Sequence, residues 1–319
     1  MSAPAPEERL WNVLRGALGT KALGIVADLG IADALADGPR PVAELARDAN
    51  PHLVHRILRA LASDGVFAEE APGVFRNTAS SELLRHDNPG RWREFAHLFG
   101  GPFYTAVGSV DGSAPTEPAF ERAFGSDFWS WLAANAEERS AFDRAMEGGR
   151  TELADKLAAL EWHDDEVVVD IGGGSGTLLR ELIERRPHLR GIVFDLPETD
   201  RDEASLGDRI EFVAGNFFEH APKGDAYILS KILHDWDDER ATAILRPIRA
   251  AAPVDARVLV LDAVIPAGNE PNSAKWLDLL MHAVPGGRER MEHEWHALLD
   301  RAGFRIERIE DGLIQARCR

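Results

Sequence analysis

The sequence predicts a mainly helical N-terminal part followed by an open, mostly parallel α/β sheet. Three observations predict this fold class. Up to about residue 100, apolar residues recur at helical spacing. After residue 165, short β-branched stretches alternate with amphipathic ones, which is typical of a parallel sheet covered by helices. At 319 residues, the chain is long enough for two such parts.

The first 100 residues are typical of three helices followed by a β-hairpin. Helical spacing is present in "ALGIVADLGIADAL", and "PVAELARDA" and "PHLVHRILRALASDG" follow it. The last of these begins at a proline, which is favoured in a first helical turn, and ends at Gly65. "VFAEEAPGVFRN" then predicts two strands around a Pro-Gly turn. This order indicates a winged helix, which we place at residues 1–100.

A winged helix raises the possibility of DNA binding through Arg56 and Arg59 on the third helix. The formal net charge of −18 argues against nucleic acid and against anionic membranes as partners. We therefore expect a packing or dimerisation domain. No apolar run approaches the roughly 20 residues of a membrane helix. The start lacks a signal-peptide pattern, and Cys318 is the only cysteine, so we expect a cytoplasmic protein.

Residues 101–319 are expected to form a second domain that opens with a helical, aromatic-rich connection up to residue 165. Phe142 and Met146 are four residues apart and share one helix face, which suits either a core or a wall for a flat apolar ligand. Strands are predicted at "EVVVDIG", "GIVFDL", "IEFVAG", "DAYILSKI" and "ARVLVLDAVI". The tail "FRIERIEDGLIQARC" predicts an antiparallel hairpin at the sheet edge.

The stretch "VVVDIGGGSGTLL" is the strongest motif in the chain. A strand runs through Asp170 into Gly172, Gly174 and Gly176, and a helix follows. Glycines let the backbone turn tightly and approach a ligand at the helix N-terminus. Thr177 stands where the dinucleotide fingerprint has its third glycine, so the spacing fits S-adenosylmethionine better than NAD. Asp195, at the end of the next strand, is placed to accept hydrogen bonds from ribose hydroxyls.

The stretch "SKILHDWDDE" permits two interpretations of His234, which follows a buried strand. The histidine is a general base at the carboxyl edge of the sheet, or it is a residue beside a helix start capped by Asp235 or Asp237. Both can hold at once. A phenol has a pKa near 10, and histidine is the side chain suited to accept its proton near neutral pH.

The glycine loop, "HDWDDE" and "GGRER" together resemble the plant-type, metal-independent O-methyltransferases, in particular their bacterial natural-product branch. The resemblance spans almost the whole chain. It implies a Rossmann-like methyltransferase sheet, a winged-helix dimerisation domain, a homodimer and S-adenosylmethionine as the methyl donor, with S-adenosylhomocysteine as its product and no metal. It further implies an aromatic hydroxylated acceptor, as in antibiotic biosynthesis.

The resemblance also assigns roles to residues. His234 matches the general base, with Glu289 and Asp262 as the acids that flank it. Phe142 and Met146 match positions facing the acceptor, and we add Trp276 and Leu280 as candidate pocket residues. The cofactor-binding residues are expected to be Asp170, Gly172, Gly174, Asp195, Leu196, Asn216, Phe217, Lys231 and Trp236.

Three positions depart from the family pattern. Asn216 stands where the family has an aspartate for the adenine amino group, and Asp262 stands where it often has a glutamate. Arg150 stands near a position where the family often has a serine, and it either pairs with a carboxylate of a ligand or lies on the surface, the latter slightly favoured. Two other functions therefore stay open: altered, non-methylating chemistry on the same scaffold, and a non-enzymatic winged-helix regulator that senses a ligand.

Overall fold

The computed structural model describes residues 5–112, 117–199 and 206–319. The chain divides into two compact units. The first comprises Met1–Ser109 and Leu132–Gly148, and the second comprises Val110–Trp131 and Gly149–Arg319. The predicted domain ranges, 1–100 and 101–319, stay a prediction.

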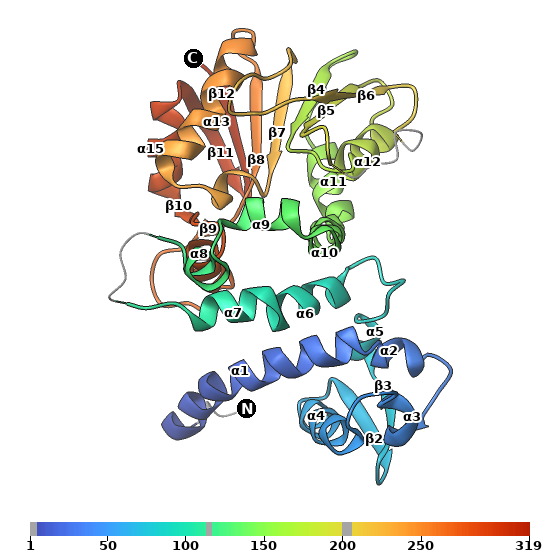
Figure 1. The fold of residues 1–319 in the computed structure, drawn as a ribbon. Coiled ribbons are helices and arrows are strands. Elements are labelled where there is room, and N and C mark those ends of the chain that lie inside the picture. Colours follow the sequence, from blue (N-terminus) through green and yellow to red (C-terminus); the bar gives the residue numbers. More distant parts are fainter. Residues whose placement is uncertain (1–4, 113–116, 200–205) are drawn as a thin grey trace. The chain divides into compact units, whose positions relative to one another are not determined.

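The first unit contains the predicted winged helix (Figure 1). Its three-stranded sheet has the order β1-β3-β2, and β2 and β3 form the hairpin that follows the third helix. Asn50 caps that helix by accepting a bond from the backbone N–H of His52 at 3.0 Å. The elements are α1 (Pro6–Asp28), α2 (Ile31–Ala34), β1 (Arg40–Pro41), α3 (Val42–Leu45), α4 (Pro51–Ser63), β2 (Phe67–Ala71), β3 (Val74–Asn77), α5 (Ala79–Glu82), α6 (Trp92–Gly100), α7 (Pro102–Gly108) and α10 (Ala136–Glu147).

Helix α10 belongs to the first unit because it packs on α6. His97 of α6 contacts Glu138 of α10 at 3.1 Å, and Arg144 of α10 contacts the buried Glu94 of α6 at 3.4 Å. Phe142 and Met146, predicted to face the acceptor, are therefore carried by a helix of this unit.

The second unit is built on a seven-stranded sheet of order β11-β12-β8-β7-β4-β5-β6. The five strands β8, β7, β4, β5 and β6 run parallel, and β12 and β11 are antiparallel to their neighbours. The predicted sheet and its C-terminal hairpin are confirmed. The strands are β4 (Val167–Ile171), β5 (Arg190–Asp195), β6 (Ile210–Ala214), β7 (Ala226–Ser230), β8 (Arg257–Leu261), β11 (Phe304–Glu310) and β12 (Leu313–Cys318), and a separate pair is formed by β9 (Val264–Ile265) and β10 (Arg290–Met291).

Helices cover both faces of this sheet, as parallel strands require (Figure 1). Successive strand residues point to opposite faces, so Val168 packs against α11 and α12, whereas Val169 packs against α13 and α15. The helical segments are α8 (Ala119–Phe124), α9 (Phe128–Ala134), α11 (Arg150–Ala158), α12 (Thr177–Arg185), the 3-10 turn η2 (Leu233–Asp235), α13 (Asp238–Ala251), α14 (Ala274–Ala283) and α15 (Glu292–Arg301).

One stretch differs from its prediction. Residues 256–265 were expected to form a single strand, but β8 ends at Leu261 and β9 begins at Val264. The break leaves Asp262 at the carboxyl edge of the sheet. None of the helices in the described part of the chain is long and apolar enough to cross a membrane.

Candidate active site

The carboxyl ends of neighbouring parallel strands bring the predicted polar residues to one edge of the sheet. Asp170 lies near the end of β4, Asp195 ends β5, and Asp262 follows β8. Lys231 follows β7, and the turn η2 after it carries His234. Because β8, β7, β4 and β5 are adjacent, their ends meet at the edge where ligands bind in open α/β sheets.

The glycine loop between β4 and α12 has a left-handed backbone. Gly172, Gly174 and Gly176 have φ angles of 66°, 59° and 78°, which residues with a side chain rarely adopt. A Cβ atom on Gly172 would lie 2.5 Å from Ile232, whereas one on Gly174 would meet no atom within 4 Å. The loop is therefore packed at Gly172 and open at Gly174.

Asp170 is buried against this loop and is 1% exposed. Within the described residues, its Oδ2 atom has no hydrogen-bond partner. Burial raises the pKa of Asp170 to about 7, while Arg150 lowers it and Asp195 adds to the rise. Buried oxygens normally have a partner, so this site suits a ligand with donor groups and positive charge. The amino-acid end of S-adenosylmethionine, with its ammonium and sulfonium, fits this requirement.

Asp195 is tied to the glycine loop. Its Oδ2 atom accepts a 2.7 Å bond from the N–H of Gly174. Its Oδ1 atom accepts bonds from the N–H of Leu196 at 2.7 Å and from Oγ1 of Thr199 at 2.9 Å. A carboxylate has about four acceptor positions, which leaves capacity for a ligand hydroxyl. Leu196 is 39% exposed beside it.

An aromatic cluster surrounds Trp236. Its ring lies edge-on to Phe217 and Phe218, with centroids 6.4 and 5.0 Å away, and is stacked on Trp129 at 5.9 Å. The side chain of Asn216 makes hydrogen bonds within the turn after β6, so it also has a structural role there. Its Oδ1 atom accepts from the N–H of Phe218 at 3.0 Å, and its Nδ2 atom lies 3.2 Å from a carboxylate oxygen of Glu219.

Two cations flank the end of β7. Lys231 has a φ of 57°, an uncommon conformation for a residue with a side chain. Burial lowers the pKa of Lys231 to about 8, and Arg150 lowers it further, against the effect of Asp262 and Asp235. Arg150, at the start of α11, donates to Oγ of the buried Ser230 at 3.2 Å. The surface position favoured for Arg150 is therefore wrong, since its head group reaches the sheet edge.

His234 is bonded to Glu289, 55 residues away in the chain. Its Nδ1 atom lies 2.7 Å from Oε1 of Glu289, and its Nε2 atom lies 3.6 Å from Oδ1 of Asp235. The histidine is 8% exposed and the glutamate 1%. An ionised carboxylate only accepts hydrogen bonds, so the Nδ1 atom carries a proton and a neutral His234 has its lone pair on Nε2.

The carboxylates around His234 change its protonation. Burial alone lowers the pKa of His234, but Asp262, Asp235 and Glu289 outweigh burial and raise it to about 9. Burial raises the pKa of Asp235 to about 7, and Asp262 and Glu289 add to the rise against the effect of His234. A base with this pKa is better matched to a phenol, near 10, than an ordinary histidine is.

Asp262 raises the pKa of His234 through its charge. It is 4% exposed, and within the described residues neither of its oxygens has a hydrogen-bond partner of good geometry. Burial raises its pKa, His234 lowers it, and Glu289 raises it further. It does not make the direct bond to the imidazole that Glu289 makes.

The loop before Glu289 makes backbone contacts with the His234 turn that the sequence pattern did not predict. A Cβ atom on Gly287 would lie 2.0 Å from the carbonyl oxygen of His234, so only glycine fits there. The N–H of Arg288 donates to that same carbonyl at 2.8 Å. Asp278 of α14 accepts the N–H of Glu289 at 2.9 Å. The two glycines of "GGRER" were the available signal.

The capping interpretation of this stretch is also confirmed, at Asp237, one of the two acids named for it. Asp237 caps α13 by accepting the N–H of Arg240 at 2.7 Å. His234 lies in η2, before the cap, and is free to have another role.

The four predicted acceptor residues lie on two helices. Phe142 and Met146 are partly buried on α10 of the first unit. Leu280 of α14 is 7% exposed, whereas Trp276 on the same helix is 69% exposed. Most of the Trp276 side chain is therefore not covered by other residues of the second unit.

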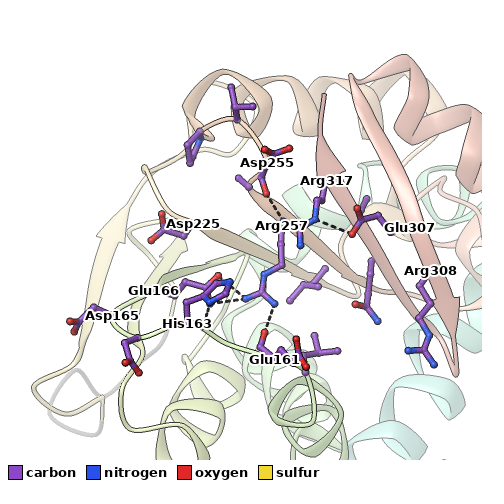
Figure 2. A pocket seen from close by; sticks show the side chains of 18 of the residues that line it. Glu161, His163, Asp165, Glu166, Asp225, Asp255, Arg257, Glu307, Arg308 and Arg317 are labelled. Carbon is purple, nitrogen blue, oxygen red and sulfur yellow. Dashed lines mark hydrogen bonds and ion pairs between the residues drawn. The ribbon is translucent and has the colours of Figure 1, made fainter.

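A cavity of about 730 Å³ lies at the opposite, amino-terminal edge of the sheet (Figure 2). Two ion pairs lie in its lining: Arg257 bonds Glu166 at 2.7 Å, and Arg317 bonds Glu307 at 3.0 Å. It is remote from the glycine loop and from His234. In the residues described, no cluster of three or more His, Cys, Asp or Glu side chains is arranged to hold a metal.

Comparison with known proteins agrees with this geometry. A parallel sheet with an antiparallel C-terminal hairpin, a glycine loop after its first strand and a winged-helix unit define an S-adenosylmethionine-dependent methyltransferase. Residues 109–305 match the O-methyltransferase domain, and residues 11–87 match the O-methyltransferase dimerisation domain. The chain therefore belongs to the O-methyltransferase family.

Three relatives illustrate the similarity. The phenazine O-methyltransferase of Lysobacter antibioticus is 39% identical over 94% of this chain and 91% of its own. The structure of mitomycin 7-O-methyltransferase has a TM-score of 0.89 and 32% identity, covering 98% of both chains. An O-methyltransferase from neocarzinostatin biosynthesis, solved with S-adenosylmethionine and 2-hydroxy-5-methyl naphthoic acid, has a TM-score of 0.77 and 30% identity, covering 94% of this chain and 96% of the other.

Proposed function

We propose that this protein transfers a methyl group from S-adenosylmethionine to a hydroxyl of an aromatic small molecule, with His234 as general base and without a metal. The observation that carries the proposal is the buried 2.7 Å contact between His234 and Glu289 at the carboxyl edge of the sheet. The acceptor class is supported by the relatives, which are O-methyltransferases of phenazine and of mitomycin biosynthesis.

The residues of the glycine loop would hold the donor. Asp195 accepts ribose hydroxyls, and the oxygen of Asp170 that has no partner accepts from the amino-acid end. Phe217 and Trp236 offer aromatic faces to the adenine, beside Asn216. Arg150 and Lys231 provide positive charge for the carboxylate of the donor. When bound, S-adenosylmethionine supplies an activated methyl group on its sulfonium.

The base acts through its ring nitrogens. Glu289 holds the Nδ1 proton and thereby fixes the tautomer that leaves a lone pair on Nε2 of His234. That nitrogen accepts the proton of the acceptor hydroxyl. Glu289 and the nearby charges of Asp262 and Asp235 then stabilise the imidazolium.

The experiment combines methyl-labelled S-adenosylmethionine, a panel of aromatic hydroxy compounds and the His234→Ala variant. Label transfer that falls by on the order of 10²-fold or more in the variant supports both the reaction and the base. Transfer that survives in the variant removes His234 as the base. Binding of the donor without any methylated product in the wild type favours altered chemistry, the alternative that Asn216 and Asp262 keep open.

The first unit is proposed to form a homodimer. Apolar side chains on α1 are exposed in the single chain: Leu10, Trp11, Val13, Leu14 and Leu18, each at least 60% exposed. Positions 10, 14 and 18 are four apart and share one helix face. A face of this kind is a protein interaction surface, and residues 11–87 match the dimerisation domain of the family.

A further inference from the structure

A buried arginine lies next to Glu289 in the short strand β10. Arg290 is 0% exposed, although it carries a charge that burial disfavours. Its guanidinium lies 5.2 Å from the centroid of the Trp295 ring. A charge in this position requires well-placed partners, and these partners indicate what the residue does.

The partners of Arg290 are the backbone carbonyls on both sides of His234. Its Nη1 atom donates to the carbonyl of Leu233 at 3.0 Å, and its Nη2 atom donates to the carbonyl of Trp236 at 2.9 Å. Its Nε atom donates to Oδ1 of Asp238 at 2.9 Å. The planar fork of the guanidinium therefore spans the turn η2 from one end to the other.

The turn needs this support because its own hydrogen bonds are long. Within η2, the N–H of Asp235 reaches the carbonyl of Ile232 at 3.3 Å, and that of Trp236 reaches Leu233 at 3.4 Å. Short 3-10 turns have poor hydrogen-bond geometry. The preceding Lys231 has its φ in the left-handed region, at 57°. Without outside contacts, such a segment does not fix the direction of the His234 ring.

Glu289 and Arg290 act on the same turn from adjacent positions. Neighbouring residues of an extended chain point to opposite sides. Glu289 thus reaches the imidazole of His234, while Arg290 reaches the backbone that carries it. The dipeptide Glu289-Arg290 therefore contacts both the imidazole ring of His234 and the backbone of the turn that carries it.

We propose that Arg290 is a positioning residue, which holds the His234 turn at the distance from Glu289 that general-base catalysis needs. The inference rests on the proposed function, in which His234 is the base. Arg290 touches neither substrate nor donor in this role, and a lysine cannot replace it because a single ammonium lacks the two-pronged geometry.

The test compares Arg290→Lys with Arg246→Lys in the full-length enzyme. Arg246 is the matched control, since it is an exposed arginine on α13 that is not among the residues of the candidate site. Two readouts are taken: kcat and KM for methyl transfer, and the pKa of His234 by NMR of ¹³C-labelled histidine. The signal of His234, one of 11 histidines, is assigned from its loss in His234→Gln.

Arg290→Lys should lower kcat by on the order of 10- to 100-fold, with KM for S-adenosylmethionine nearly unchanged, because a displaced base loses alignment. Arg290→Lys keeps the charge, so a fall of the His234 pKa from about 9 toward 6.5 reports lost contact with Glu289. Loss of the positive charge alone would raise the pKa of His234. Arg290→Gln, which removes the charge, therefore separates the effect of charge from the effect of geometry. The control should change neither readout.

An unchanged kcat and an unchanged His234 pKa in Arg290→Lys would overturn the proposal. Where Arg290→Lys does not fold, Asp238→Ala is the deciding variant, since it removes the carboxylate that orients Nε of Arg290. The proposal requires a several-fold lower kcat at constant KM in Asp238→Ala. Wild-type kinetics of this variant would overturn it. Activity that persists in His234→Ala refutes the proposed function instead, while the NMR result still tells whether Arg290 positions His234.

Discussion

Nδ1 of His234 lies 2.7 Å from Oε1 of Glu289, and the glutamate is 1% exposed. This pair joins the turn after β7 to the loop before β10. Because the contact is buried and charge-assisted, it is stronger than a contact of the same length on the surface. The predictions for the catalytic centre follow from it.

Replacing Glu289 by glutamine keeps the shape of the side chain and removes its charge. We expect kcat to fall by on the order of 10²- to 10³-fold, because the imidazolium loses its counter-charge and the amide can stabilise the wrong tautomer. Steady-state methyl transfer measures this. Glu292→Gln, an exposed change on α15, is the control. Equal activity of the two variants would contradict the assigned role of Glu289.

The pH dependence of kcat/KM should follow the raised pKa of His234. A base acts in its unprotonated form, so a pKa raised to about 9 moves the rising limb of the profile from near pH 6.5 to near pH 9. Phenols with different pKa values distinguish the enzyme from the acceptor, since a limb that follows the acceptor belongs to the phenol. A flat profile between pH 7 and pH 9 is incompatible with this prediction.

Asp170→Asn should stabilise the ligand-free protein at high pH while weakening S-adenosylmethionine binding. The folded pKa of Asp170, about 7, lies above its ordinary value of 3.8. Between these values the folded state binds more protons, so its stability falls as the pH rises through this range. At about 1.4 kcal/mol per pKa unit, the variant gains on the order of 2–4 kcal/mol at pH 8.

Thermal unfolding at pH 5 and pH 8, together with calorimetric titration of S-adenosylmethionine, tests Asp170→Asn. The gain in stability should be larger at pH 8 than at pH 5. Unchanged affinity for the donor would remove Asp170 from the binding residues.

In the first unit, the ion pairs of His97 should stabilise the fold only while its imidazole is protonated, that is, below about pH 9. It lies between Asp28 of α1, at 2.7 Å, and Glu138 of α10, at 3.1 Å. The bond to Asp28 raises the pKa of His97, burial lowers it, and Glu138 raises it again, to about 9. Its contribution is complete below the unfolded pKa, near 6.5, and is lost as the pH rises through 9.

His97→Gln should therefore destabilise by about 1 kcal/mol at pH 6, after allowance for solvent screening, and by less at pH 10. Denaturant unfolding at the two pH values measures the difference. His52→Gln is the control, because His52 is an exposed histidine on α4 of the same unit. A loss for His97→Gln that is the same at both pH values would show that packing, and not charge, is responsible.

The α1 surface predicts the effect of added charge on assembly. Leu14→Glu places a carboxylate in the exposed apolar face of α1, where Leu14 is 70% exposed. If this face joins two copies, the variant runs as a monomer in light scattering under conditions where the wild type is a dimer. Val254→Glu, at a 77% exposed position of the second unit, should leave the mass unchanged. A dimeric Leu14→Glu would move the interface elsewhere.

Most of the fold could be predicted because its signals are local. The β-branched strands and the hairpin at Asp311-Gly312 stand within two residues of their predicted positions. The stretch predicted as one strand over 256–265 was wrong, because apolar periodicity does not reveal where a strand leaves its sheet. That break is what carries Asp262 to the ligand edge.

The candidate site could be predicted in its members more than in its contacts. "HDWDDE" and "GGRER" indicated His234 and Glu289, but nothing local indicated that Arg290 reaches the carbonyls on both sides of His234. For Arg150 a surface position was slightly favoured over pairing with a ligand carboxylate, yet its head group bonds Ser230, 80 residues away. Roles for Phe142, Met146, Trp276 and Leu280 stay predictions.

By itself, the sequence determined the strand–helix alternation, the glycine loop and the residue types at the sheet edge, because backbone propensity and period-2 or period-3.6 burial act over a few neighbouring residues. Tertiary structure alone decided that Glu289, and not Asp262, makes the direct 2.7 Å contact with His234, that Arg290 is buried beneath the same turn, and that α10 joins the first unit. These contacts join residues far apart in the chain, and only the packing of helices on a finished sheet sets their distances and, with them, the pKa of the base.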